Sequence, residues 1–299
     1  MSNLNEIKNR INSVRSTRQI TSAMKMVASA KLHKAQALIE NMHPYQQKLE
    51  EMLESLLAAD VRIESPYIEA RPAERVAIVL FASNASLCGS FNANVQKMLE
   101  HVLQDYALLG RDRLQLFPVG KKAEEAVKRL GYTAEASCRT MADKPSYAAA
   151  HELADRLMQA FVAGRVDKVE LIYHHFHSAG VQQLTRETYL PLRLSPSGAS
   201  PSSASLPSAS VSAPSEVFHR DYIMEPSREE LLTRLLPLVL GQKMYTVLLD
   251  AHTSEHAARM MAMQTATDNA ADLIQELTRQ YNKSRQQAIT NELLDIMNG

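Results

Sequence analysis

Cys88 is the side chain of this 299-residue sequence whose type and position come nearest to those of a catalytic residue. It lies in the loop SNASLCGSFN, residues 83–92, between an expected strand and an expected helix, which is where α/β folds bind ligands. A thiol at a helix N-terminus can serve as a nucleophile. However, the loop has one glycine where a phosphate-binding loop needs several, and neither a Walker lysine nor a nearby histidine accompanies it. We therefore expect a small, partly buried cysteine in a connecting loop.

Three histidines, His174, His175 and His177, fall together in an expected strand. A metal ion needs three or four converging ligands, whereas strand alternation puts only His175 and His177 on one face. We expect solvated histidines on an edge strand. The sequence thus predicts no catalytic residue, no metal site and no bound cofactor.

Positive charge is concentrated at the N-terminus, although the whole chain has 33 Lys and Arg against 33 Asp and Glu. A segment with many basic residues and one acid, Glu6, attracts an acidic protein, a phosphate or an anionic surface. No aromatic residue interleaves the basic ones and no recognition motif follows, so we expect an acidic protein partner and no nucleic acid. The basic residues are Lys8, Arg10, Arg15, Arg18, Lys25, Lys31 and Lys34.

The cysteine count and the hydropathy pattern limit the cellular setting. Two cysteines, Cys88 and Cys138, provide neither a disulfide framework nor metal-ligand spacing, which is typical of a reducing compartment. No apolar run approaches the roughly 18 residues of a membrane span, and the N-terminus lacks a secretory signal. The acid-poor start could also be a mitochondrial transit peptide, but its pattern runs on to residue 58 without a processing site. We expect a soluble protein, or one attached to a membrane only through other proteins.

Two long helices at the ends of the chain must position everything else. Residues 227–299 begin with a capping box, Ser227 and Glu230, and would extend roughly 105 Å as one helix. Residues 1–58 form the second helix, roughly 80 Å long, which Pro44 should kink or interrupt. We expect the two to pack on each other as a long antiparallel coiled coil, a hairpin whose turn is an inserted domain.

Each helix carries a narrow seam of apolar and small residues at a spacing of three and four, which is typical of a coiled coil. The C-terminal seam is weak, because Thr267, Ala270 and Ser284 stand where a strong zipper has Leu or Ile. Its expected positions are Met260, Met263, Thr267, Ala270, Ile274, Leu277, Tyr281, Ser284 and Ala288. The N-terminal seam is expected at Leu4, Ile7, Ile11, Val14, Ile20, Met24, Val27, Leu32, Ala35, Leu38, Met42, Leu49, Met52, Leu53 and Leu56.

The inserted segment, residues 72–194, is expected to be a Rossmann-like α/β domain. Short apolar runs alternate with helical patterns, which favours a mostly parallel sheet covered by helices. The last two strands are separated by a few residues around Gly180 and should pair as an antiparallel hairpin. The expected strands are residues 75–81, 114–119, 168–176 and 182–192, and the expected helices are residues 91–107, 121–130 and 146–162.

Residues 195–216 form a tract rich in Ser, Pro and Ala with one charged side chain. Such a composition cannot bury enough apolar surface to offset the entropy of ordering it. We expect a mobile loop between the inserted domain and the C-terminal helix.

Both ends of the chain resemble the gamma subunit of F-type ATP synthases. At the N-terminus the resemblance lies in EIKNRI, SVRST and ITSAMKMVA, residues 6–11, 13–17 and 20–28. At the C-terminus it lies in SEHAARM, ATDNA and YNKSRQQAITNEL, residues 254–260, 266–270 and 281–293. The match covers the whole chain apart from the Ser/Pro tract.

The resemblance implies a rotor that transmits torque between proton flow and ATP synthesis or hydrolysis. In that family the terminal helices turn inside a ring of three alpha and three beta subunits, and the α/β domain sits with the epsilon subunit on the membrane-embedded c-ring. ATP chemistry takes place on the beta subunits, which implies that this chain is non-catalytic. The implied location is peripheral, on the cytoplasmic face of a bacterial inner membrane, with the mitochondrial matrix side a less favoured alternative.

Contact residues carry over from the family only onto matching positions. Met24, Lys25 and Cys88 would face the acidic collar loops of the beta subunits. A second group, near the end of the C-terminal helix, would meet the inner surface of the ring; it consists of Arg285, Gln286, Thr290 and Glu292.

Two departures from the family pattern matter. The family loop Ser-Asp-Arg-Gly-Leu-Cys-Gly-Gly-Phe-Asn is here residues 83–92, SNASLCGSFN, which has lost an acid, a base and two glycines. The Ser/Pro tract replaces a short loop, and no regulatory cysteine pair is present, so we expect no redox control. Two other functions remain as alternatives to the rotor: an α/β enzyme that depends on Cys88, and a coiled-coil scaffold that self-associates through its long helices.

Overall fold

The computed structural model describes residues 2–57, 65–69, 71–192 and 227–298. The Ser/Pro tract, residues 195–216, and the mobility expected for it lie outside these described residues.

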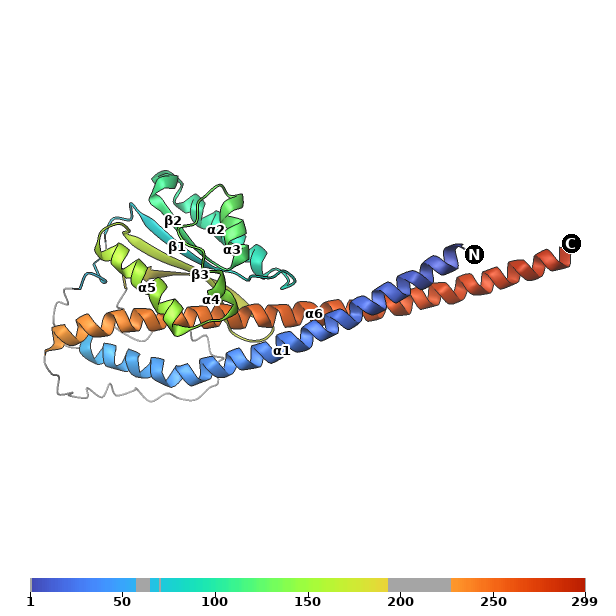
Figure 1. Ribbon diagram of the computed structural model, residues 1–299, viewed down its shortest axis with the longest axis horizontal. Coiled ribbons are helices and arrows are strands. Elements are labelled where there is room, and N and C mark those ends of the chain that lie inside the picture. Colours follow the sequence, from blue (N-terminus) through green and yellow to red (C-terminus); the bar gives the residue numbers. More distant parts are fainter. Residues whose placement is uncertain (1, 58–64, 70, 193–226, 299) are drawn as a thin grey trace, which may run out of the picture.

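Two helices of unusual length form the frame of the molecule. Helix α1 is Ser2–Leu57 and helix α6 is Arg228–Asn298, and the two lie side by side in opposite directions (Figure 1). The expected N-cap is present, because the Ser227 hydroxyl oxygen accepts a hydrogen bond of 3.2 Å from the Glu230 N–H. The antiparallel hairpin predicted from the sequence is confirmed. We call the paired helices α1 and α6 the shaft.

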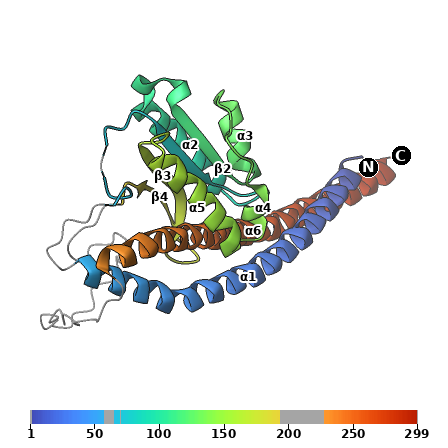
Figure 2. The same ribbon diagram turned by 60° about the vertical axis from the view of Figure 1, so that its left-hand side comes forward.

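Of the two outcomes expected at Pro44, a kink or an interruption, the interruption does not occur. The helix continues through Pro44 to Leu57 and curves along α6 (Figure 2). A proline removes one backbone hydrogen bond, and packing on both sides can offset that loss. The packing beyond Pro44 comes from Leu53 and Leu56, which bury themselves against leucines near the start of α6, Leu232 and Leu236.

Between the two helices the chain forms a four-stranded sheet. Its strands are β1 Val76–Phe81, β2 Leu114–Val119, β3 Lys168–Phe176 and β4 Gln182–Leu190, in the order β2-β1-β3-β4. β1 pairs in parallel with β2 and with β3, and β4 pairs antiparallel with β3. The predicted parallel sheet and its terminal hairpin are confirmed.

Helices cover both faces of this sheet. β1 is wholly buried, and its alternate side chains enter two different cores. Val76, Ile78 and Leu80 pack with α2 Phe91–Asp105 and α3 Lys121–Arg129. Ala77, Val79 and Phe81 pack with α5 Tyr147–Val162 and with α6.

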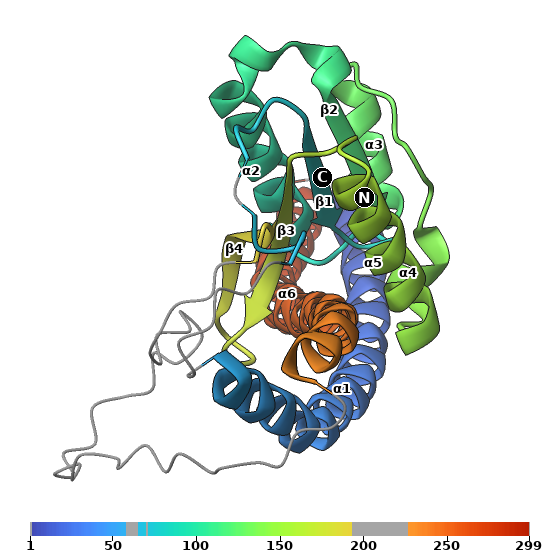
Figure 3. The same ribbon diagram turned by 90° about the vertical axis from the view of Figure 1, so that its left-hand side faces the viewer.

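Three short elements were not predicted. They are η1 Ala107–Leu109, η2 Arg111–Arg113 and α4 Arg139–Asp143, each too short to display a helical period in the sequence. A view along the shaft shows the α/β domain resting on α6, with α1 on the far side of α6 (Figure 3). Helix α6 therefore belongs both to the shaft and to the core of the α/β domain.

Candidate partner-contact site on the shaft

The α6 side of the shaft seam is where the sequence predicts it. Met263, Ala270 and Leu277 are buried there. The other expected positions are all partly covered: Met260, Thr267, Ile274, Tyr281, Ser284 and Ala288.

The α1 side of the seam differs from the prediction over its central part. Ile20, Met24 and Val27 were expected in the seam, but they are 60%, 41% and 58% exposed. The positions that face α6 are instead Thr21 and Ala28. A strict alternation of three and four residues, continued from Ile11 and Val14, arrives at Thr21 and Ala28. A choice made by apolar character alone selects the exposed residues beside them. Leu38 and Met52 were assigned to the seam in the same way and are likewise exposed.

Polar side chains bond across the seam at this level. The Thr267 hydroxyl donates a hydrogen bond of 2.8 Å to the Thr21 hydroxyl. The Lys25 ammonium donates one of 2.9 Å to the Gln264 side-chain oxygen. Small and polar residues bury little apolar area, which contributes about 25 cal/mol per Å², so the seam is weak here, as its sequence predicts.

Two of the predicted contact residues on α1 therefore have different surroundings. Met24 points away from α6 and is exposed, together with Ile20, Met26 and Val27. Lys25 is half-buried, and its charged group is engaged with Gln264 inside the molecule. An exposed apolar group of this kind marks a surface that other proteins can cover.

At the far end of α6, residues 285–297 are all exposed except Ala288, which is partly covered. Helix α6 runs on beyond the start of α1 (Figure 1). The predicted contact residues Arg285, Gln286, Thr290 and Glu292 all lie here and are exposed. The Thr290 hydroxyl donates a hydrogen bond of 2.9 Å to the Gln286 carbonyl of its own helix. Large apolar side chains are exposed among them, namely Ile289, Leu293, Leu294, Ile296 and Met297.

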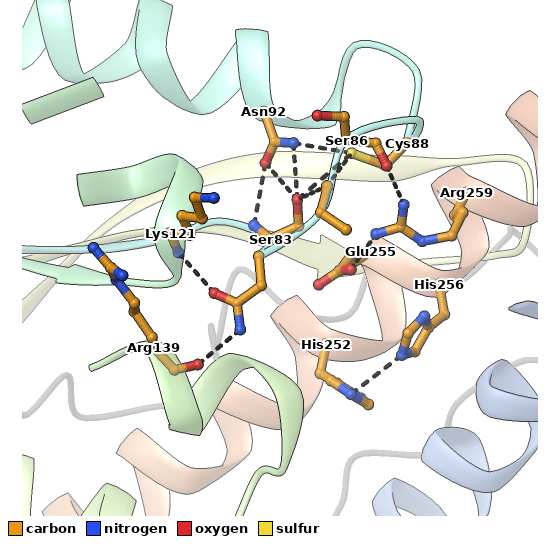
Figure 4. Close-up of polar contacts among 12 residues, drawn as sticks. Ser83, Ser86, Cys88, Asn92, Lys121, Arg139, His252, Glu255, His256 and Arg259 are labelled. Atoms are coloured by element: carbon orange, nitrogen blue, oxygen red, sulfur yellow. Dashed lines mark hydrogen bonds and ion pairs between the residues drawn. The ribbon is translucent and has the colours of Figure 1, made fainter. Parts of the chain in front are cut away.

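Cys88 occupies the loop between β1 and α2, and its side chain is only 2% exposed. The Asn92 amide donates a hydrogen bond of 3.0 Å to the Cys88 sulfur and one of 2.8 Å to the Ser83 hydroxyl oxygen (Figure 4). The sulfur also contacts the Ser83 hydroxyl, at 3.8 Å, and the Ala85 carbonyl, at 4.0 Å. In the part of the chain that the structure describes, no histidine or carboxylate bonds to Cys88, so its setting is that of a buried structural cysteine, as the sequence favours.

Helix α6 holds this loop in place through one arginine. The Arg259 guanidinium donates a hydrogen bond of 2.5 Å to the Ser86 carbonyl and forms an ion pair with Glu255 (Figure 4). Asn84 extends the connection, because its amide donates to the Arg139 carbonyl at 2.8 Å and its side-chain oxygen accepts from the Lys121 N–H at 2.7 Å. The loop is thereby joined to α3, α4 and α6 at once.

Side chains of α6 lie against the carboxyl ends of β1 and β2, the edge where α/β folds bind ligands. What is left is a cavity of about 10 Å³, room for one water molecule. Its walls come from the sheet, from α4 and from α6, and include Phe81, Val119, Ala142, His252 and Glu255.

The expectation of solvated edge-strand histidines is wrong for His174 and His175. β3 is an inner strand, because β4 pairs along its outer side. His174 is buried and stacks on Phe91 with ring centroids 4.3 Å apart, and this burial lowers its pKa to about 4. His175 bonds through Nδ1 to the Asp250 carboxylate at 2.5 Å, and this bond raises its pKa. Only His177 is exposed.

Within the described ranges, no three His, Cys, Asp or Glu side chains converge as metal ligands. None of the described helices combines the length and the apolar composition needed to cross a bilayer.

Sequence reasoning missed a buried polar row on α6 where the shaft meets the sheet. It consists of Asp250, Thr253, Ser254, Glu255 and His256. The signal was available, because residues 250–256, DAHTSEH, interrupt an otherwise apolar stretch of the helix. The Ser254 hydroxyl donates a hydrogen bond of 3.0 Å to the His174 carbonyl, which ties this row to β3.

Comparisons with known proteins agree over the whole length. A family model described as ATP synthase matches residues 3–299. The chain is 58% identical over 299 residues to an ATP synthase gamma chain of Bacteroides thetaiotaomicron, covering 100% of this chain and 99% of the relative. It is 41% identical over 300 residues to an ATP synthase gamma chain of Flavobacterium johnsoniae, covering 100% and 98%.

Solved structures share the fold. A chain in the Euglena gracilis mitochondrial ATP synthase (OSCP/F1/c-ring) superposes with a TM-score of 0.65 at 19% identity, covering 99% of this chain and 93% of that one. A chain in the Tetrahymena thermophila mitochondrial ATP synthase (central stalk/c-ring) superposes with a TM-score of 0.56 at 22% identity, covering 83% and 99%.

Proposed function

The chain belongs to the ATP synthase gamma chain family, and from this premise we propose that it is the central rotor of the complex. In this role it transmits torque between proton flow through the membrane ring and ATP synthesis or hydrolysis on the ring of alpha and beta subunits. The observation that carries the proposal is the shaft, whose outer end exposes both charged and apolar side chains of α6. A single exposed helix end with this composition is suited to contact with a ring of protein subunits around it.

The rotor itself is non-catalytic in this proposal, and ATP is made or hydrolysed on the beta subunits. The setting of Cys88 supports this assignment, since its sulfur is buried among Ser83, Asn92 and a backbone carbonyl. The packing of α6 side chains against the sheet's ligand-binding edge supports it too, because the remaining cavity holds no more than one water.

Two surfaces contact the catalytic ring. The first is the exposed side of α1 around Met24, which meets the acidic loops of the beta subunits together with the basic residues beside it. The neighbouring Lys25 first has to exchange its bond with Gln264 for a partner carboxylate. At position 88 the loop, and not the cysteine itself, contacts the beta subunits. The Cys88 side chain is buried, whereas the neighbouring Leu87 is 58% exposed. The second surface lies on α6 and comprises Arg285, Gln286, Thr290 and Glu292.

The remaining partners bind at the opposite end. We assign the epsilon subunit and the c-ring to the α/β domain, residues 72–194, and to the adjoining base of the shaft. The chain is then held at the cytoplasmic face of the bacterial inner membrane through these partners. The bacterial origin of relatives that are 58% and 41% identical supports that sidedness.

Purification from native membranes tests the proposal. An affinity tag inserted within residues 195–216 leaves both shaft helices and the sheet unaltered. We expect the tagged chain to bring down alpha and beta subunits, three of each per copy, with ATPase activity in the eluate. Recovery of the chain alone would contradict the proposal, and recovery as a homodimer without ATPase activity would instead support a self-associating scaffold.

Substitutions then test the contact residues. Arg285→Ala combined with Gln286→Ala should weaken co-purification of alpha and beta subunits or reduce rotation-coupled ATP synthesis several-fold. Lys97→Ala, which removes an exposed charge from α2, is the matched control and should change neither. Equal behaviour of the double variant and the control would remove the α6 residues from the contact.

A further inference from the structure

Two histidines one turn apart on α6 face each other inside the protein. The Nε2 atoms of His252 and His256 are 3.2 Å apart, and the two rings stand at 87° to one another (Figure 4). His256 is 5% exposed. No partner contact proposed above uses either residue.

The hydrogen bond between the two rings tolerates at most one added proton. A hydrogen bond between two imidazoles needs one ring nitrogen that donates and one that accepts, which two neutral rings provide. The Nδ1 atoms of both rings are buried and have no hydrogen-bond partner among the described residues. One added proton creates a buried cation without an acceptor at Nδ1, and a second leaves two N–H groups pointing at each other.

The surroundings oppose a positive charge on either ring. Lys31 of α1 and Arg259 of α6 are the nearby cations, and they act against protonation of His256. The nearby acids are Asp143, at the end of α4, and Glu255, which is already paired with Arg259. Burial is the main cause that lowers the pKa of His252 to about 4 and that of His256 to about 3. The cations add to this effect, and Asp143 opposes it at His252.

The histidine pair lies between several elements, so that protonation of the pair can change how these elements pack. His252 lines the cavity between α6, α4 and the carboxyl ends of the strands. Lys31 affects both rings from α1, where Ala28 and Leu32 are buried in the seam. The pair thus lies where the shaft helices and the α/β domain meet.

We propose that His252 and His256 form an acid-sensitive joint that holds α6 against α1 and α4 when the pair is neutral and opens when it is protonated. Closure is complete above pH 6.5, the ordinary pKa of a histidine in the unfolded chain, and is lost progressively as the pH falls below it. Glu255 acts in the opposite sense, because burial raises its pKa and thereby favours the folded state at low pH. The joint is a property of this chain's own packing and does not depend on the rotor function.

Hydrogen exchange of the full chain at pH 7.5, 6.0 and 5.0 tests the joint, with exchange corrected for its intrinsic pH dependence. In the wild type we expect amides of residues 247–260 to lose more than tenfold of their protection between pH 7.5 and 5.0, relative to the amides of β1. In His256→Gln the amide still offers one donor and one acceptor to His252 but takes up no proton. The loss should then be several-fold smaller than in the wild type, because only the His252 ring is left to take up a proton.

His151→Gln is the matched control, because His151 also has a buried Nδ1 without a partner in the described part of the chain and contacts α6 at Gly241. It should retain the full wild-type response. Equal pH responses in wild type and His256→Gln would overturn the proposal. If His256→Gln does not fold, NMR titration of the wild-type imidazoles decides, with His252→Gln used for assignment: midpoints below pH 5 support the joint, and midpoints above pH 6 refute it.

Discussion

At the scale of single residues, the bond between His175 and Asp250 ties the β3–β4 hairpin to α6 in a way that depends on pH. The hydrogen bond to the Asp250 carboxylate raises the pKa of His175 above its ordinary value of 6.5. A histidine whose pKa is raised by folding contributes stability that is complete below pH 6.5 and is lost as the pH rises through the folded-state pKa. The hairpin should therefore loosen from α6 at alkaline pH, in the direction opposite to the His252–His256 joint.

The hairpin prediction is tested with His175→Gln. Hydrogen exchange of β4 in the wild type should accelerate between pH 6 and pH 9 beyond its intrinsic change, whereas in His175→Gln the corrected rates should be the same at both pH values. His177→Gln removes an exposed histidine two residues away and should behave like the wild type. A wild-type β4 whose corrected exchange does not change with pH would contradict the prediction.

Gly120 is a residue that no other type can replace. It ends β2 with φ of +99°, and a Cβ atom there would lie 2.0 Å from the Ala82 carbonyl oxygen. We expect Gly120→Ala to cost about 3 kcal/mol or more in the free energy of unfolding, because strain and the displacement of β1 add together. Gly110→Ala also has a positive φ, +82°, but its Cβ would meet open space, so about 1 kcal/mol is expected. Thermal unfolding followed by circular dichroism compares the two, and similar melting temperatures would refute the argument.

At the scale of elements, the small residues of the seam set how closely α1 and α6 approach. Ala35 is 2% exposed, and the larger side chain in Ala35→Leu would force the helices apart at a cost of about 1–3 kcal/mol. Ala37→Leu adds the same side chain to the exposed side of α1 and should change the stability by less than about 0.5 kcal/mol. Denaturant unfolding of the full-length variants measures the difference. Stabilisation by Ala35→Leu would mean that the seam has room that the structure does not show.

The strands and the longer helices of the α/β domain could be predicted closely from the sequence, because each of them has a strong local signal. β2 and β3 begin and end at the predicted residues, and Ser146 caps α5 by accepting a hydrogen bond from the Ala149 N–H. Helix α4 could not be predicted, since it depends on tertiary contacts such as the Arg139–Glu124 ion pair.

The α1 seam was only partly predictable for a related reason. Its central positions, Thr21 and Ala28, are polar or small, so that periodicity and apolarity point to different faces of the helix. The apolar residues that the seam leaves out, Ile20 and Met24 among them, are exposed in the isolated chain. In the proposed rotor these residues are covered by partner subunits, and the apolar spacing within one chain carries no information about such partners. The His252–His256 pair was missed because spacing alone does not reveal what two polar side chains face.

At the scale of the whole molecule, the outer end of the shaft should be the part most sensitive to its partners. Lys283 and Arg285 are exposed on a stretch of α6 with few buried neighbours, and such helix ends open readily. Trypsin should cut the isolated chain early after Arg285. Binding of alpha and beta subunits should slow this cleavage more than tenfold, while cleavage after Arg113, which is 54% exposed on the α/β domain, should keep its rate. Mass spectrometry of timed digests measures both, and unchanged cleavage after Arg285 in the complex would remove this region from the ring contact.

The placement of the shaft helices at the two ends of the chain also governs how the protein is made. Helix α1 leaves the ribosome first and has no partner until α6 follows, on the order of tens of seconds later. The sheet also cannot complete its packing before α6 is made, because Leu240, Met244 and Leu248 of α6 belong to one of its two cores. Folding of the shaft and of this core is therefore completed only after α6 has been synthesised. A chain that stops early keeps apolar surface exposed on both α1 and the sheet, and is thereby recognisable to proteases as incomplete.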